Sequence, residues 1–540
     1  MARSLPQCID TVIIGNGPSA LILSYILHGN IPYYVGGHHD NILDAKLSKQ
    51  PNLLHITPDL YAHFASSLRY STQALPVNTL LDTLIRPNAD TEINPQSCIR
   101  WRYEPEKAVS HAAIGDTEHA GGQWADNPVS ASTDIGTLSY AEQLSLPGYS
   151  YADHVAKKAK QDQCDFVRPS RIEVADYLRA YPEAVGIKDA VFAGMRVDDV
   201  YRTRDGFMIG SLGITCKHLV LASGTFTVNI PPPVSLAPIA ALHSVERPLL
   251  VIGSGFSAAD VIISTPSTRR IIHVFQWAPD RRPSPLRGCH HTAYPEYAAV
   301  YRQMKLAAIT PSKNQGTKPI TTRRKSSLYQ NRDWSFYQGL PNAEVIDVAI
   351  FTETASATVT IRLASGKQIQ REVGGLDYVV GRRGTLDFLS DELRTEIFST
   401  PDQAMPVDTH ALISGRTLRP KAETSLELAK NVLITGSLTG DSLIRHAVGG
   451  CVFAAGRIMH TIPTMYSPDS TPSPTTSSSP RSTWPTSRSA SPDSEDTPAL
   501  QRTTTRELTN GHADLHLDRR RLTRSVEVTH AENKLWVGSG

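Results

Sequence analysis

The chain has 540 residues, enough for two or three domains, and its 40% hydrophobic and 20% charged residues are typical of a soluble globular protein. A formal net charge of +2 argues against a dedicated nucleic-acid binder, and no apolar run approaches the ~20 residues of a membrane-spanning helix. The first predicted strand begins within about a dozen residues of Met1, so we expect no signal peptide and a cytoplasmic location.

The cysteines and histidines predict no metal site. Six cysteines are scattered without a Cys-x-x-Cys pair, which indicates free thiols in a reducing compartment. The histidine doublets at 38–39 and 290–291 have no carboxylate or cysteine at ligand spacing. Adjacent residues of an extended chain also point to opposite faces, so we expect no bound metal.

The first predicted element is a short buried strand at 11–14 that breaks on glycines and resumes as an apolar helix. The break has the Gly-x-Gly-x-x-Ala pattern of dinucleotide-binding loops. Its first glycine permits a tight turn, its second lets the backbone approach a pyrophosphate, and its alanine keeps the helix close to the strand. The helix N-terminus then meets the negative charge. The candidate binding residues are Gly15, Gly17, Pro18, Ser19 and Ala20.

A second strand of the same nucleotide fold is predicted at 31–35. In such folds an acidic residue about 20 positions past the glycines accepts hydrogen bonds from the ribose hydroxyls. Here the strand ends in Gly36-Gly37-His38-His39-Asp40, so the acid is displaced or missing. Asp40 is the nearest candidate.

The tetrapeptide Gly121-Gly122-Gln123-Trp124 has two interpretations. Paired glycines allow close approach to a flat ligand, and a tryptophan can pack against a ring. The alternative is a glycine turn followed by a core tryptophan. Taken alone, the tetrapeptide favours the turn and core tryptophan.

A capping box at Ser170-Arg171-Ile172-Glu173 predicts a helix that runs through Tyr181. From Ala190 the pattern changes to alternation, with a hairpin turn at 204–206. The chain then enters a buried strand that ends in Ala-Ser-Gly-Thr. The backbone of Ser223, Gly224 and Thr225 is therefore expected beside whatever ligand lies over the sheet.

A second glycine fingerprint lies at 248–259, more than two hundred residues after the first, and reads PLLVIGSGFSAA. Its strand is predicted at 249–252. It repeats the strand, glycine loop and helix of the first copy, and its serine can donate to a phosphate. Two nucleotide sites are thus predicted in one chain. The residues of this second site are Gly253, Gly255, Ser257 and Ala258.

The strand after the second fingerprint, at 270–275, ends at Gln276, where an NAD-selective domain usually carries Asp or Glu. Arg281 and Arg282 follow closely. A missing acid with nearby arginines suits a 2′-phosphate and favours NADPH. A solvated basic loop is the alternative.

The remaining ordered part returns the chain toward the first nucleotide domain. Residues 342–373 alternate as short strands, and a buried strand at 377–380 ends in Gly381-Arg382-Arg383-Gly384. A last strand at 432–435 runs into a glycine loop with Gly440 and Asp441, followed by a helix. The carboxylate of Asp441 could accept hydrogen bonds from a sugar or sugar-alcohol chain, could cap the helix, or could do both.

Beyond residue 462 the sequence is dominated by Ser, Thr and Pro. Such a composition cannot bury enough apolar surface to offset its ordering entropy, so we expect 463–540 to be disordered. Arg519-Arg520-Arg521 in this tail is either a solvated charge cluster or a targeting signal.

The order of these motifs resembles that of flavoproteins with two dinucleotide-binding domains, in which an NADPH domain is inserted into an FAD domain. Within that group, Gly121-Gly122-Gln123-Trp124 resembles the Gly-Gly-x-Trp of class B flavin-dependent monooxygenases. His243-Ser244 resembles the end of their Phe-x-Gly-x-x-x-His signature, but Ala237 and Ile239 replace the Phe and the Gly. This departure puts in question the usual coupling of NADP binding to oxygenation.

A closer resemblance, over about residues 8–460, is to the oxidative stress-induced growth inhibitor family. It is carried by three strings: Gly15-Asn16-Gly17-Pro18-Ser19 with Leu23-Ser24-Tyr25-Ile26-Leu27, then Pro32-Tyr33-Tyr34, and Gly440-Asp441-Ser442-Leu443-Ile444-Arg445-His446-Ala447.

The resemblance implies an α/β fold with two Rossmann-like domains, whereas the disorder predicted for the C-terminal tail rests on its composition alone. The implied organisation is an FAD domain at 1–242 and 376–462, an inserted NADPH domain at 243–375, and the tail at 463–540. The first fingerprint, Gly122, Gln123, Trp124, Ser223, Gly224, Thr225, Gly440 and Asp441 would then hold FAD, and the second fingerprint with Arg281 and Arg282 would hold NADPH.

The implied reaction is NADPH-dependent insertion of one oxygen atom from molecular oxygen into a small organic substrate through a flavin C4a-(hydro)peroxide. Trp124, Arg445 and His446 are the candidates on the flavin and substrate side, although Arg445 and His446 could equally be structural. Two other functions stay open: an NADPH oxidase or reductase, and a flavin-bearing redox regulator whose tail meets a partner. The sequence leaves the substrate and the oligomeric state undetermined.

Overall fold

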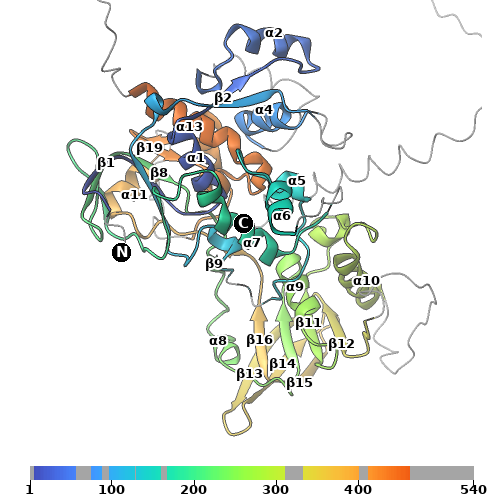
Figure 1. Cartoon of the computed structure of the whole chain (residues 1–540). Coiled ribbons are helices and arrows are strands. Elements are labelled where there is room, and N and C mark those ends of the chain that lie inside the picture. Colours follow the sequence, from blue (N-terminus) through green and yellow to red (C-terminus); the bar gives the residue numbers. More distant parts are fainter. Residues whose placement is uncertain are drawn as a thin grey trace, which may run out of the picture.

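The computed structural model describes residues 5–55, 74–87, 96–127, 129, 131–159, 167–309, 332–399 and 412–461. Their helices and strands form two α/β units that lie one above the other in Figure 1. We call the unit built on the first fingerprint strand the first unit and the one built on the second fingerprint strand the second unit. The tail predicted at 463–540 lies outside the described residues.

Strand β1 (Cys8–Ile14) is the centre of the first sheet. It pairs in parallel with β8 (Ile214–Leu221) on one side and with β4 (His111–Ile114) on the other. Residues 11–14 are buried, as expected of a parallel strand that is covered on both faces. The rest of this sheet consists of β5 (Val191–Phe192), β6 (Val200–Arg202), β7 (Phe207–Ile209), β18 (Glu427–Ala429) and β19 (Val432–Ile434). The predicted hairpin at 204–206 joins β6 to β7.

Helix α1 (Pro18–Leu27) follows the first glycine loop and packs against α13 (Val448–Thr461) in the core of the first unit. Helix α7 (Arg171–Ala184) begins at the predicted capping box. The Ser170 hydroxyl accepts from the Glu173 N–H, and the Glu173 carboxylate accepts from the Ser170 N–H. Other helices of the unit are α4 (Pro76–Ile85), α5 (Ala141–Leu144), α6 (Tyr151–Ala159), α11 (Asp391–Phe398) and α12 (Arg419–Thr424).

The strand predicted at 31–35 forms, but its predicted place in the first sheet is wrong. It is β2 (Asn30–Tyr34), which pairs antiparallel with β3 (Ile99–Tyr103) in a separate sheet, beside α2 (Asn41–Lys49). Figure 1 shows these elements at the end of the first unit that is far from the second. The strand that follows α1 in the nucleotide fold is β4. The described elements between α1 and β4 are therefore an insertion, which hydrophobic periodicity cannot distinguish from the fold itself.

The second sheet is parallel throughout, in the order β12 (Tyr337–Pro341), β11 (Ile271–Phe275), β10 (Leu249–Ile252), β16 (Gly375–Tyr378). Helices α9 (Phe256–Ser264) and α10 (Pro295–Ile309) cover one face. The strands predicted at 342–373 form an antiparallel sheet that packs on the opposite face, as the second core cluster of this unit shows. Its strands are β13 (Glu344–Phe351), β14 (Ser356–Arg362) and β15 (Gln368–Val373).

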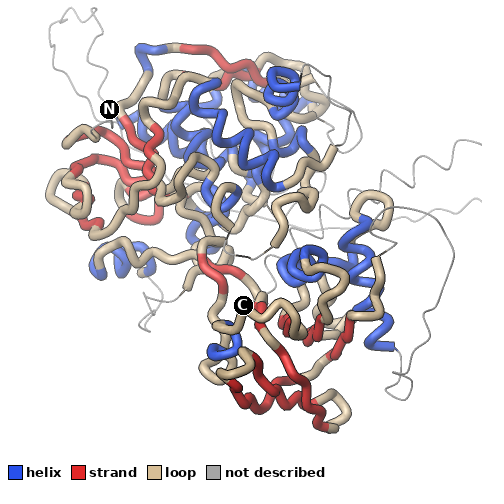
Figure 2. Tube along the Cα trace, turned by 60° about the horizontal axis from the view of Figure 1, so that its bottom comes forward, coloured by secondary structure: helices blue, strands red, loops and turns tan. Residues whose placement is uncertain are grey.

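Two short strands carry the chain between the units. β9 (Val228–Asn229) leads out of the first unit toward α8 (Ala237–Ala240), and β17 (Arg382–Arg383) leads back. They pair antiparallel, and Figure 2 shows the chain crossing between the two bodies at this point. Because β16 belongs to the second sheet, the return crossing falls after Tyr378, a few residues beyond the predicted boundary at 375/376.

The described elements thus confirm an α/β fold with two Rossmann-like units, the second inserted into the first. Among the helices described, none combines the length and apolar character needed to cross a membrane. The cysteines at described positions form no disulfide.

Candidate functional site

The first glycine loop is held tightly on one side and open on the other. Gly15 has a φ of +126°, and a β-carbon there would lie 2.5 Å from the Ala222 oxygen. A β-carbon on Gly17 would meet no atom within 4 Å. Gly17 is also the N-cap of α1 and offers no side-chain cap. The first-turn N–H groups of α1 therefore face open space, as an anion-binding helix N-terminus requires.

The Gly-Gly-Gln-Trp segment packs directly on this loop. A β-carbon on Gly122 would lie 3.1 Å from the Gly17 α-carbon, so only glycine fits without displacement. Asn16 holds the segment in place through hydrogen bonds. Its side-chain oxygen accepts from the Thr117 hydroxyl at 2.9 Å, and its backbone oxygen accepts from the Gly121 N–H. Trp124 packs against the core of the first unit and also lines a pocket. The core interpretation of this tryptophan is therefore confirmed, and its contact with a ligand ring stays a prediction.

The ends of β8 and β19 complete the surroundings of the first loop. The Thr225 N–H donates to the Ser437 hydroxyl at 3.1 Å. The hydroxyls of Ser223 and Thr435 are buried and have no hydrogen-bond partner among the described residues. Buried polar groups are normally satisfied, so these hydroxyls fit a polar ligand along this edge. The uncapped N-terminus of α1, the free space beside Gly17 and the unpartnered hydroxyls of Ser223 and Thr435 together fit FAD.

Asp40 is not at this edge. It follows β2, and its carboxylate accepts from the N–H groups of Ile42 and Leu43 as the N-cap of α2. The ribose-binding role predicted for Asp40 assumed that the strand at 31–35 belongs to the first sheet, which is wrong.

The residue at the acid position is identified by matching the two units. Gly15 N–H donates to the Ile114 oxygen at the end of β4, as Gly253 N–H donates to the Val274 oxygen in β11. Ile114 therefore matches Val274, and two residues later Asp116 matches Gln276. Asp116 is exposed beside the first glycine loop. The sequence signal for it was present: a short apolar strand immediately before the Gly-Gly-Gln-Trp loop.

Asp441 is buried and its contacts correct the predicted helix cap. One carboxylate oxygen accepts from the Leu75 N–H at 2.8 Å and from the Asn78 amide at 2.6 Å, and the other accepts from Arg419 at 2.6 Å. Leu75 is the N-cap residue of α4, so Asp441 binds the start of a distant helix instead of the one that follows it. The preceding Gly440 has a φ of +94° and turns the chain. A sugar-binding role for this carboxylate stays a prediction.

Arg445 and His446 lie in a buried ionic cluster beside α4. Arg445 donates to Asp82 through Nε at 2.9 Å and Nη2 at 2.5 Å, and Arg86 donates to the other oxygen of the same carboxylate. Burial alone would raise the pKa of Asp82, but the two guanidinium groups hold it well below its usual range. Burial lowers the pKa of His446, whose Nε2 lies 3.9 Å from Asp82. These contacts favour the structural alternative for both residues, and their catalytic role stays a prediction.

The second glycine loop repeats the first. Gly253 has a φ of +155°, and a β-carbon there would collide with the Val379 oxygen after β16. Gly255 is the N-cap of α9 and offers no side-chain cap. Ser254 joins the loop to the end of β11, because its hydroxyl accepts from the Gln276 N–H at 3.0 Å. The helix N-terminus again faces open space, next to Ser257.

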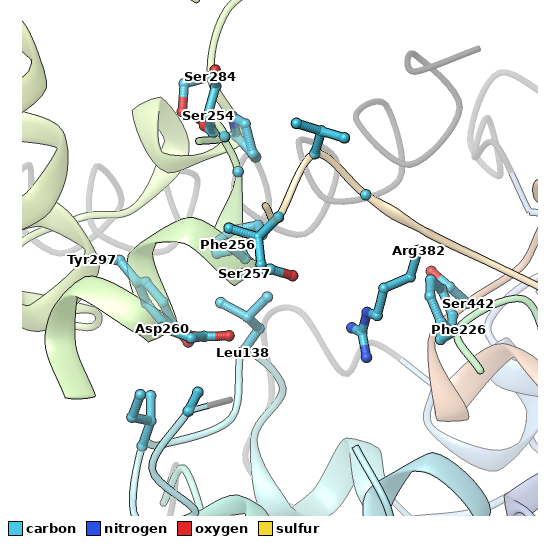
Figure 3. A pocket seen from close by; sticks show the side chains of 18 of the residues that line it. Leu138, Phe226, Ser254, Phe256, Ser257, Asp260, Ser284, Tyr297, Arg382 and Ser442 are labelled. Atoms are coloured by element: carbon cyan, nitrogen blue, oxygen red, sulfur yellow. Dashed lines mark hydrogen bonds between the residues drawn. The ribbon is translucent and has the colours of Figure 1, made fainter. Parts of the chain in front are cut away.

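A pocket of about 1000 Å³ lies between the two units (Figure 3). The second unit contributes its glycine loop, and the first unit contributes Trp124 and the segment 442–444. Neither Arg445 nor His446 lines it. The predicted site residues that do line it are Gln123, Trp124, Gly253, Gly255, Ser257, Arg281 and Arg282.

The pocket is also lined by charged and polar residues that the sequence did not single out as site residues, among them Arg171, Asp260, Tyr297 and Arg382. Burial raises the pKa of Asp260 to about 6, against the opposing effects of a 2.8 Å hydrogen bond from the Tyr297 hydroxyl and of the charges of Arg382 and Arg171. The sequence did mark Gly381-Arg382-Arg383-Gly384 as the end of a buried strand. In open parallel sheets, ligands bind outside the carboxyl ends of the strands, where this segment lies.

Comparisons with known proteins agree with the resemblance found in the sequence. No protein-family model matches the chain. Oxidative stress-induced growth inhibitor 1 of Mus musculus is 25% identical over 510 residues, which cover 85% of this chain and 97% of the mouse protein. Its Homo sapiens counterpart is 27% identical over 391 residues, 64% of this chain and 79% of the human protein. The resemblance to these growth inhibitors is confirmed.

Two solved structures follow a similar course over 84% of this chain and 99% of theirs. A flavin-containing monooxygenase from Stenotrophomonas maltophilia is 13% identical, with a TM-score of 0.46. A bacillithiol disulfide reductase from Staphylococcus aureus is 12% identical, with a TM-score of 0.45.

Proposed function

We propose that this chain is an FAD- and NADPH-dependent oxidoreductase, and specifically a monooxygenase that inserts one oxygen atom into a small organic substrate. One observation carries the proposal. Two glycine loops, each opening onto an uncapped helix N-terminus, are brought by separate parallel sheets to one interface with a pocket between them. Paired nucleotide sites of this kind suit electron transfer from one cofactor to the other.

We assign FAD to the first unit. Its pyrophosphate would lie on the N-terminus of α1 beside Gly15, Gly17 and Gly122, where the open side of the loop leaves room. Asp116 would accept from the ribose hydroxyls, in place of Asp40. The orphan hydroxyl of Ser223 would hydrogen-bond farther along the cofactor.

We assign NADPH to the second unit. Gly253, Gly255 and Ser257 would hold its pyrophosphate at the N-terminus of α9. Gln276 stands where an acid would repel a 2′-phosphate, and Arg281 and Arg282 line the same pocket. This arrangement favours NADPH over NADH.

When bound, FAD supplies the chemistry that passes two electrons from NADPH to molecular oxygen. The protein's part is to orient the reactants and to keep water away from them. The apolar side chains of Ile135, Leu138, Phe226 and Phe256 line the pocket and lower its water content. Trp124 bridges this lining and the first core, which fixes the wall on the FAD side.

An NADPH oxidase or reductase is the second candidate, and the position of His243 favours it. This exposed histidine follows α8, and the next residue, Ser244, donates its N–H to the Gly374 oxygen just before β16. It therefore lies at the amino end of the second sheet, opposite the edge that carries the glycine loop. In this conformation it takes no part in the pocket.

The test is NADPH consumption by the purified, FAD-loaded protein, with hydrogen peroxide measured in parallel. A monooxygenase consumes NADPH slowly without substrate and releases little peroxide. One peroxide per NADPH, unchanged by any candidate substrate, would establish the oxidase. The control is Gly17→Val, whose side chain fills the open space at the first loop: it is expected to fold, to purify without flavin, and to oxidise no NADPH.

A further inference from the structure

Arg382 makes no ion pair within the described residues. Arg168 and Arg445, for comparison, have carboxylate partners in Glu296 and Asp82. Arg382 instead donates from Nη1 to two neutral amides, Gln123 Oε1 at 3.2 Å and Asn127 Oδ1 at 3.4 Å. Neutral amides orient a guanidinium without balancing its charge.

The free side of this guanidinium faces the pocket. Its Nε is buried and has no hydrogen-bond partner within the described part of the chain. The Phe226 ring lies under it, 5.0 Å from ring centre to guanidinium carbon. Figure 3 shows Arg382 reaching into the pocket from the side opposite Asp260. A buried donor left without a partner costs free energy unless a ligand accepts from it.

The charges around Arg382 have a positive excess. Arg171 lines the same pocket and, within the described ranges, makes no ion pair. Asp260 is the carboxylate that both arginines face, and it already accepts from Tyr297. Burial lowers the pKa of Arg382 to about 10, a value at which the group is still charged at neutral pH. One carboxylate thus faces two guanidinium groups.

We propose that Arg382, assisted by Arg171, binds the carboxylate of an organic acid with an apolar body, and that such acids are the substrate class of this pocket. The carboxylate would accept from the Nε side of Arg382, and the apolar body would contact Phe226, Leu138 and Trp124. Only the statement that these acids are substrates rests on the proposed function. The binding site itself does not depend on it.

The phosphates of NADPH are the other possible source of negative charge. The second glycine loop already offers its own N–H groups to them, at the N-terminus of α9 and near Arg281 and Arg282. Arg382, in contrast, is held by Gln123 and Asn127, which belong to the first unit. This places its guanidinium on the FAD side of the pocket.

The test measures binding of benzoate, of its neutral counterpart benzyl alcohol, and of inorganic phosphate to the full-length, FAD-loaded protein. Binding is read from the shift in unfolding temperature and from the flavin absorbance. The variants are Arg382→Gln and, as a second and less buried change, Arg171→Gln. Arg383→Gln is the matched control, because Arg383 is the neighbour of Arg382 in β17 but does not line the pocket.

We expect benzoate to bind the wild type and R383Q alike and to bind R382Q about tenfold or more weakly, the loss expected for one charge-assisted hydrogen-bonded pair. R171Q should weaken benzoate by a smaller factor, and benzyl alcohol should bind all four proteins equally. Equal binding of benzoate and benzyl alcohol to the wild type would overturn the proposal. So would phosphate binding more tightly than benzoate, or a rise in the KM for NADPH in R382Q with benzoate binding unchanged. If benzoate binds as expected but NADPH never reduces the flavin, the proposed function fails and the acid site stands.

Discussion

The backbone oxygen of Ala222 lies 2.5 Å from the point where a β-carbon on Gly15 would stand. Gly253 and the Val379 oxygen repeat this relationship in the second unit. In each unit, the residue after one parallel strand closes against the first glycine of the fingerprint, so the turn has no room for a side chain.

This relationship predicts different effects for the two glycines of the first loop. Gly15→Ala adds an atom against a fixed carbonyl at a φ that L-residues rarely adopt, so we expect poor folding and little protein with flavin. Gly17→Ala adds its atom in open space, so the variant should fold normally but bind FAD at least tenfold more weakly, because the methyl group takes the place of the pyrophosphate. Circular dichroism and the flavin content after dialysis separate the two effects. Normal flavin content in both variants would contradict this account of the loop.

The match between Asp116 and Gln276 predicts which acid meets the FAD ribose. Asp116→Ala should raise the Kd for FAD about tenfold, since hydrogen bonds to a charged acceptor contribute about 1.5–3 kcal/mol. Asp40→Asn is the matched control. It removes charge from an N-cap but keeps an acceptor, and we expect unchanged FAD affinity and at most a small loss of stability. Titration of the flavin-free protein with FAD measures both. If Asp40→Asn weakened FAD binding more than Asp116→Ala, Asp40 would be the acid that contacts the ribose.

The raised pKa of Asp260 predicts a pH-dependent cost of folding. Its pKa is about 6 in the folded chain against 3.8 ordinarily, so the folded state holds the proton more tightly. The carboxylate therefore lowers stability as pH rises from about 4 to about 6, and the cost is complete above that range. Asp260→Asn should raise the unfolding temperature at pH 7.5 by about 2–4 °C, the shift produced by about 1 kcal/mol, and should have a smaller effect at pH 4.

Asp176→Asn provides a control of opposite sign. Against the effect of burial, Lys158 and His154 lower the pKa of Asp176, so its carboxylate contributes stability above its ordinary pKa and loses it at lower pH. The variant should be less stable than the wild type at pH 7.5, and the difference should shrink as pH falls. If both variants shift in the same direction, the assignment of the Asp260 effect is wrong.

The buried cluster around Asp82 predicts strong coupling with Arg445. Asp82→Asn leaves Arg445 and Arg86 without a countercharge, which should cost about 3–5 kcal/mol. Arg445→Gln should cost a similar amount, and the double variant should lose clearly less than the sum, as urea unfolding can measure. If Arg445 acts only through structure, D82N and R445Q should also lower the activity per bound flavin equally. A much larger loss in R445Q would support a catalytic role.

Several parts of the fold are local enough to be predicted from sequence. Each glycine fingerprint contains its own strand, turn and helix within about twenty residues, and the capping box at Ser170 contains both halves of its hydrogen-bond pair. These signals do not depend on which residues stand elsewhere in the chain.

Other parts depend on pairing between distant segments. Residues 30–34 carry no signal that shows whether they pair with β1 or with a strand at 99–103. Because the sequence analysis placed them beside β1, it predicted the ribose contact at Asp40 and not at Asp116. The helix-cap role predicted for Asp441 is wrong for the same reason, because its partner Leu75 lies far away in sequence. Arg382 gave only a positional signal: its chemistry depends on which side chains from the first unit approach it.

The paired strands β9 and β17 have a mechanical consequence. The two chain crossings between the units form one hydrogen-bonded ribbon and are not two independent linkers. Any swivel of the second sheet against the first must bend or twist this ribbon. Arg382 is part of the ribbon and is bonded to Gln123 and Asn127 of the first unit, so such a swivel would strain or break those two hydrogen bonds. A movement that separates the two nucleotide sites would therefore also withdraw Arg382 from Gln123 and Asn127.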